Sequence, residues 1–206
     1  MAASRRLGVL AITMMVVAEP AWAHHVMGGK LPQTFLQGLM SGFGHPVIGF
    51  DHLAAIVGVG ILAALAGRSA AVVLAFSVAV MAGVGLHLAK IDLPASELFV
   101  GLTTLLIGAL VIARQSMGAG VAALLFAIAG LVHGYALGES IVGAEPSPLM
   151  AYLLGLLVIQ TAIGISVYAA VRSLAGWPAR TAGLTVVGVL VALAGGIATA
   201  AAAGLA

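Results

Sequence analysis

Long apolar runs, separated by short breaks, occupy almost the whole chain after residue 30. Six runs can be distinguished, at about residues 46–66, 70–89, 96–113, 118–139, 148–171 and 181–203. A helix needs about 20 apolar residues to cross the hydrocarbon core of a bilayer, and a backbone in lipid must satisfy its own hydrogen bonds. The sequence therefore predicts an all-α, polytopic membrane protein with six transmembrane helices.

The composition excludes several other classes of protein. Only 7% of the residues are charged and 63% are hydrophobic, whereas a soluble domain has about 25% charged residues. The chain has no cysteine, which excludes disulfides, iron–sulfur clusters and thiolate metal sites. It has neither the basic patch of a nucleic-acid-binding protein nor a GxxxxGK[ST] phosphate loop. We therefore expect membrane lipid around the chain, no nucleic-acid partner and no ATPase motor of that type.

The first 23 residues have the pattern of a cleavable signal peptide. Arg5 and Arg6 precede a short apolar core of about 11 residues, which is too short to span a bilayer. Ala21-Trp22-Ala23 then supplies a small–x–small cleavage site. We expect residues 1–23 to be the signal peptide, 24–45 a periplasmic N-terminal segment and 46–206 the six-helix transmembrane domain.

The charges in the breaks predict the orientation of the chain. With a periplasmic mature N-terminus, the cytoplasmic breaks would contain Arg68, Arg114, Arg172 and Arg180. The outer breaks would contain Lys30 and Lys90, together with Asp92, Glu97 and Glu145. Four basic residues inside against two outside is the direction of the positive-inside rule. The signal peptide and the arginines thus agree on an inner-membrane protein with its N-terminus outside.

Two apolar runs contain ionisable residues at matching intervals. The stretch HPVIGFDH contains His45, Asp51 and His52, and LVHGYALGES contains His133 and Glu139. We expect His45 to precede a helix that begins at Pro46. The two runs would cross the membrane in opposite directions, which places His45 at the depth of Glu139 and His52 at the depth of His133. This recurrence is compatible with a 3+3 inverted repeat, as in many secondary transporters.

A charge buried in lipid costs at least about 2.5–3.5 kcal/mol, so this group of residues calls for partners or a function. Imidazole and carboxylate without thiolate suit nickel, cobalt, zinc or copper(II). A mature terminus at His24 would add an amine and an imidazole, and His87 lies near the same outer layer. The candidate metal ligands are His24, His45, Asp51, His52, His87, His133 and Glu139. For His87 alone, a packing histidine bonded to a neighbouring helix remains the alternative, and Glu97 fits an interfacial charge.

HPVIGFDH, followed by AAIVGVG, and HGYALGES resemble the signature of the HupE/UreJ family. The resemblance implies a cleaved signal peptide, a mature terminus that begins with histidine, and six spans. It also implies a secondary permease, not an enzyme, which takes up nickel or cobalt for hydrogenase or urease maturation. His45, Asp51 and His52 would then serve the metal pathway with His133 and Glu139. No prosthetic group is implied, and the metal would be cargo: nickel first, cobalt next, with copper and zinc open.

Two functions of other classes also use these residue types. An intramembrane zinc hydrolase would need three ligands and an open position for water, but the sequence has no HExxH. A b-type haem protein would pair His45 or His52 with His133 as axial ligands. Faces rich in Ala and Gly in the last two runs would also permit a homo-oligomer.

Overall fold

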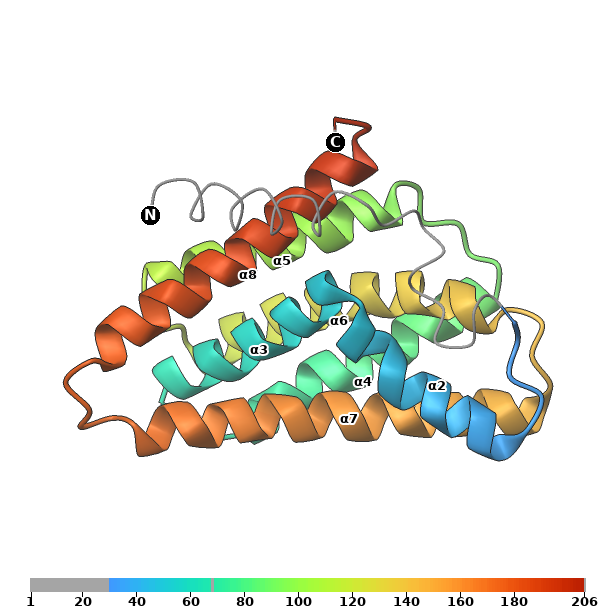
Figure 1. The fold of residues 1–206 in the computed structure, drawn as a ribbon, viewed down its shortest axis with the longest axis horizontal. Coiled ribbons are helices and arrows are strands. Elements are labelled where there is room, and N and C mark those ends of the chain that lie inside the picture. The colour runs from blue at the N-terminus through green and yellow to red at the C-terminus, as the bar shows by residue number, and fades with distance from the viewer. Residues whose placement is uncertain (1–29, 68, 206) are drawn as a thin grey trace, which may run out of the picture.

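The computed structural model describes residues 30–67 and 69–205. Within these ranges the chain is all-helical, and no strand is formed. The helices are α2 (Phe35–Ile48), α3 (Phe50–Leu65), α4 (Ala71–Leu88), α5 (Ser96–Ile112), α6 (Ala119–Gly138), the 3₁₀ turn η2 (Glu139–Ile141), α7 (Pro146–Ser173) and α8 (Arg180–Ala202). Figure 1 shows them as an elongated bundle in which α3 lies between the α5–α8 pair and α7.

Length and hydropathy identify several membrane spans among these helices. Four segments are long and apolar enough to cross a bilayer: Ala71–Leu88, Ala119–Ile141, Pro146–Ser173 and Arg180–Ala202. Helices α2 and α3 together form a fifth, bent by 79° at their break. Helix α5 is apolar but shorter, with 17 residues. Each predicted apolar run is helical over most of its length, and the chain is a multi-pass membrane protein with four or five candidate spans by this criterion.

The prediction that a helix begins at Pro46 is wrong. Helix α2 begins eleven residues earlier, at Phe35, after a capping box in which Thr34 Oγ1 accepts from the Gln37 N–H at 3.2 Å and Gln37 Oε1 accepts from the Thr34 N–H at 3.3 Å. It continues through His45 and Pro46, which lie in its last turn. Proline lacks an N–H, but the helix ends two residues later, so little hydrogen bonding is lost. The predicted boundary between residues 45 and 46 therefore falls inside α2.

The chain bends at Gly49, between α2 and α3. The Gly49 N–H donates to the His45 carbonyl at 3.0 Å, and the Gly49 carbonyl accepts from the Leu53 N–H at 2.9 Å. Both helix ends are thus hydrogen-bonded across the bend. A Cβ at this position would lie 2.8 Å from His52 Cδ2, so a side chain here would press on the His52 ring. The bend directs the first turn of α3 into the bundle.

Glycines bring neighbouring helices into backbone contact. In α6, Gly130, Gly134 and Gly138 pack on α4, where added Cβ atoms would collide with the carbonyl oxygens of Phe76 and Val80 and with the His87 side chain. The order of these contacts shows that α4 and α6 run parallel. Small residues allow such approach in membrane bundles. The predicted packing role of the glycines is confirmed for this pair of helices.

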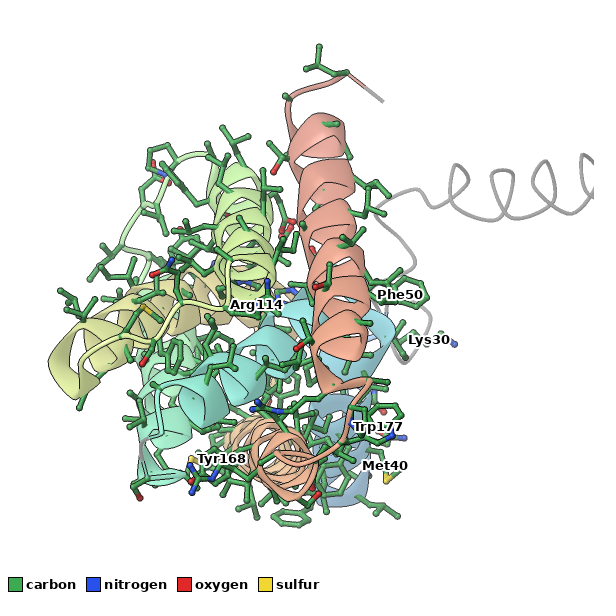
Figure 2. The ribbon with its side chains drawn as sticks, turned by 90° about the vertical axis from the view of Figure 1, so that its left-hand side faces the viewer. Lys30, Met40, Phe50, Arg114, Tyr168 and Trp177 are labelled. Atoms are coloured by element: carbon green, nitrogen blue, oxygen red, sulfur yellow. The ribbon has the colours of Figure 1, made fainter. Side chains whose placement is uncertain are left out.

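The relative directions of the other helices also follow from their contacts. Helix α2 runs parallel to α7, with Gly38 near Pro148 and Gly42 near Tyr152. Helix α5 runs antiparallel to α8, and Figure 2 shows these two helices side by side above α7, which is seen end-on. Phe50 is 77% exposed and points away from the bundle in the same view. An apolar outer surface of this kind is what a lipid-facing bundle requires.

Substituting Gly134 by alanine should destabilise the bundle, because its Cβ would collide with the Val80 carbonyl and push α6 away from α4. We expect a loss of about 1–3 kcal/mol, the usual cost of overpacking. Gly120→Ala in the same helix is the matched control, because nothing lies within 4 Å of that position. Thermal unfolding of the detergent-purified variants measures the effect, and equal midpoints for both would contradict the packing described here.

Candidate metal-ion site

Three histidines from three helices meet in the interior of the bundle. His45 comes from α2, His52 from α3 and His133 from α6. They are 5%, 5% and 0% exposed, respectively. Buried polar side chains are costly unless they are hydrogen-bonded. The hydrogen-bond partners of each ring nitrogen therefore show how its burial is compensated.

The shortest contact in the site joins the rings of His52 and His133. Their Nδ1 atoms lie 2.8 Å apart, and the ring centroids are 4.8 Å apart in an edge-on arrangement. At this distance one Nδ1 carries a proton and donates to the lone pair of the other. The two facing nitrogens therefore share one proton in a direct hydrogen bond.

Two threonines of α5 assign the tautomers of this pair. Thr103 Oγ1 donates to the Val100 carbonyl at 3.0 Å, and Thr104 Oγ1 donates to the same carbonyl at 2.9 Å. Their lone pairs remain for His133 Nε2, which lies 3.3 Å and 3.4 Å from the two hydroxyl oxygens. This arrangement favours the tautomer in which His133 donates from Nε2 and its Nδ1 accepts from His52 Nδ1.

His45 is held beside the pair by two hydroxyl groups. Its Nδ1 lies 3.0 Å from Ser140 Oγ and 3.2 Å from Tyr152 Oη. Each hydroxyl also donates to the Leu137 carbonyl, at 3.1 Å and 2.8 Å. The His45 ring centroid is 6.3 Å from that of His52. A third imidazole therefore lies beside the pair.

Asp51 brings a carboxylate to the start of α3. Its Oδ1 accepts from the His52 backbone N–H at 2.8 Å, and the side chain is half-buried. An acidic residue in the first turn is stabilised by the helix dipole. The Asp51 carbonyl also lies 3.4 Å from Thr104 Oγ1, which ties α3 to α5 beside His133. The carboxylate of Asp51 is thus held beside His52, its neighbour in the sequence.

The structure brings the histidines of the two motifs together. His52 contacts His133, and His45 contacts Ser140, the neighbour of Glu139. Glu139 itself is exposed. His87 packs on Tyr135 with ring centroids 4.5 Å apart, and its Nδ1 has no hydrogen-bond partner among the described residues. His24 lies outside the described residues.

The ligands do not converge as they would in a preformed metal centre. Within residues 30–67 and 69–205, no three His, Asp or Glu side chains are grouped so that they could hold one ion. His45 is instead turned toward Ser140 and Tyr152. The three histidines are therefore held by hydrogen bonds to one another and to hydroxyl groups.

The haem alternative fits this geometry poorly. The described part of the chain has no three grouped ligands, and this counts equally for a hydrolytic zinc site and for a transported ion, so it does not separate those two functions. Axial haem ligands must stand on opposite faces of a macrocycle. The rings of His52 and His133 are in direct contact at 2.8 Å, which leaves no room for one.

The hydroxyl groups of the site were not predicted from the sequence. Thr103, Thr104, Ser140 and Tyr152 bond the histidines, but only ionisable residues were considered as candidates. The pair Thr103-Thr104 interrupts the apolar stretch LFVGLTTLLIG. A double polar residue inside a membrane span is a signal that could have identified it.

Comparisons with known proteins agree with the two sequence motifs. The family model described as HupE / UreJ protein matches residues 12–200. Protein HupE of Rhizobium leguminosarum bv. viciae is 35% identical over 128 residues, which cover 61% of this chain and 64% of that protein. The match thus spans less than two thirds of that relative. No solved structure matches the chain. The family match extends over nearly the whole sequence, and the chain belongs to the HupE/UreJ family.

Proposed function

We propose that this protein is a secondary transporter that takes up a divalent transition-metal ion across the bacterial inner membrane. The observation that carries the proposal is the buried pair of His52 and His133, whose facing nitrogens lie 2.8 Å apart. Imidazole is a ligand for nickel, cobalt, zinc and copper alike. Nickel is the first expectation and cobalt the second, in line with the family resemblance. The imported ion would supply a metalloenzyme maturation system.

The proposed topology has six spans and a periplasmic mature N-terminus behind a cleaved signal peptide. The helix directions support it. Spans that are two apart, such as α4 and α6, should run parallel, and spans that are three apart, such as α5 and α8, should run antiparallel. Both directions are found. Helix α5, with 17 residues, is about 26 Å long. This is close to the thickness of the hydrocarbon core, about 30 Å. A short span of this kind is accommodated by local thinning of the bilayer.

The packing also supports a 3+3 inverted repeat, with α3–α5 equivalent to α6–α8. In such a repeat the parallel pair α4–α6 corresponds to a parallel pair α7–α3. Gly60 of α3 packs on Gly164 and Val167 of α7, which is consistent with that direction. His52 and His133 would then lie on equivalent helices at the repeat interface. Secondary transporters of this architecture place their substrate site there.

Uptake would begin with attraction of the cation to the Asp51 carboxylate near the outer end of α3. The proton on His52 Nδ1 would move to Nε2 of the same ring, and the ion would then bind Nδ1 of both neutral rings, since a metal-binding nitrogen must be unprotonated. His133 is prepared for this role, because Thr103 and Thr104 accept from its Nε2. A doubly charged ion gains about 4.6 kcal/mol per 100 mV on moving inward. The membrane potential could therefore power uptake, with or without a proton gradient.

Replacing His133 by glutamine should abolish metal uptake, because it removes the lone pair prepared at Nδ1. We expect the nickel uptake rate of expressing cells to fall at least about tenfold, the loss that follows from 1.4 kcal/mol of ion binding. Thr185→Val on α8 is the comparison, because the Thr185 hydroxyl bonds the Thr181 carbonyl of its own helix; its uptake should stay within about twofold of wild type. Normal uptake by His133→Gln, at equal protein levels in the membrane, would contradict the assignment.

Removing the two hydroxyl groups of α5 should weaken metal binding without removing a ligand. In Thr103→Val/Thr104→Val, His133 loses the acceptors that hold its proton on Nε2. Partners of a ligating histidine are typically worth about 10–100-fold in affinity, and we expect a loss in that range by calorimetry on purified protein. Thr185→Val on α8 is the control, since its hydroxyl bonds only the Thr181 carbonyl. Unchanged affinity in the double variant would show that these threonines do not orient His133.

Acid should inhibit uptake. Protons compete with the metal for the histidine nitrogens, whose unperturbed pKa is about 6.5. We expect the initial rate of nickel uptake, measured at constant membrane potential, to fall as the external pH is lowered from 7.5 to 5.5. A rate that rises steadily over this interval would contradict coordination by imidazole.

A further inference from the structure

A second group of buried polar side chains lies apart from the histidines. Gln160 of α7 is 1% exposed and Ser77 of α4 is fully buried. Neither amide atom of Gln160 nor the hydroxyl oxygen of Ser77 has a hydrogen-bond partner in the part of the chain that the structure describes. Thr161 Oγ1 is also buried and without a partner there. Buried polar atoms almost always have partners, so several orphaned atoms in one region call for an explanation.

The packing of α4 on α7 brings Ser77 and Gln160 to the same interface. A Cβ on Gly164 would lie 2.5 Å from Val73 Cγ1, which places these two residues opposite each other. The helices run antiparallel, since α6 is parallel to α4 and the chain reverses between α6 and α7 (Figure 1). Ser77 lies one turn after Val73, and Gln160 lies one turn before Gly164. Residues four apart share a helix face, so Ser77 and Gln160 lie at the same part of the α4–α7 interface.

In the proposed topology, this part of the α4–α7 interface lies on the cytoplasmic side of the histidine pair. Tyr152 contacts His45 at the outer end of α7, and Gln160 follows it by residues 152 to 160, about 12 Å along the helix. Phe76, the neighbour of Ser77, has its ring centroid 5.8 Å from that of His133. An ion that left the histidines inward would therefore meet Gln160 and Ser77 next.

We propose that Gln160 and Ser77 form an inner transit site for the transported cation, a proposal that rests on the transport function above. The amide oxygen and the hydroxyl oxygen bind the ion while it keeps part of its hydration shell. Neutral oxygens hold a borderline transition-metal ion less strongly than imidazole does. The ion is thus passed from a tighter to a weaker site, which favours release. The absence of protein partners for these atoms leaves them available for this ligand.

A packing role does not account for these residues. Apolar side chains of similar volume would fill the same space without leaving polar atoms unsatisfied. A resident structural water is the remaining occupant, because buried waters commonly bridge such groups. A structural water would make Gln160 dispensable for transport, whereas a transit site would not. The two occupants therefore predict different uptake rates for a substitution at this position.

Gln160→Met, which keeps the length of the side chain, tests the proposal. Nickel uptake by cells and equilibrium nickel binding by purified full-length protein are both measured. We expect uptake to fall at least about tenfold, while affinity at the histidines stays within about twofold of wild type. Gln115→Met is the matched control, because Gln115 is exposed in a break between helices, and it should match wild type in both measurements.

Ser77→Ala is the second variant, and it removes a single oxygen if the methionine variant fails to accumulate. We expect slower uptake with unchanged binding, whereas Ser166→Ala, at an exposed position of α7, should behave as wild type. Wild-type uptake by Gln160→Met or, in its place, by Ser77→Ala would overturn the inner site and leave the proposed function intact. Loss of equilibrium binding in parallel with uptake would also overturn it. Absence of nickel uptake by the wild type would overturn both proposals.

Discussion

The hydrogen bond between His52 and His133 is the interaction on which the site depends. It joins α3 to α6 at 2.8 Å in an interior that offers these rings little water. Because one nitrogen must donate and the other accept, the nitrogen that accepts must carry no proton. The threonine hydroxyls of α5 lie against the other nitrogen of His133, Nε2. Three helices are thus coupled through one imidazole.

The backbone arrangement serves this contact. Gly130, Gly134 and Gly138 allow α6 to pack closely on α4, and this packing places His133 at the centre of the bundle. The bend at Gly49 separates His45 from His52, so the two imidazoles approach from different helices. A continuous helix would have carried both rings along one face. The bend therefore places His45 on a separate helix, with its ring centroid 6.3 Å from that of His52.

Sequence periodicity predicted the apolar helices well, because the bilayer imposes a length and hydropathy that are easily recognised. The matching depths of His52 and His133 followed from the equal intervals in the two motifs. The course of the chain through His45 and Pro46 did not, since local preference before proline was overridden by packing of α2 on α7. The hydroxyl partners were also missed. Thr104 and Tyr152 become visible as site residues only when the fold brings α5 and α7 to the histidines.

X-ray absorption spectroscopy of the nickel-loaded, purified protein tests the central claim most directly. The account predicts imidazole nitrogen ligands at about 2 Å from the metal, with the imidazole scattering reduced when His52 is replaced. It requires that at least two histidines bind the same ion, because both His52 and His133 are proposed as ligands. A spectrum with only oxygen ligands, or one that is unchanged by the loss of His52, would contradict the account.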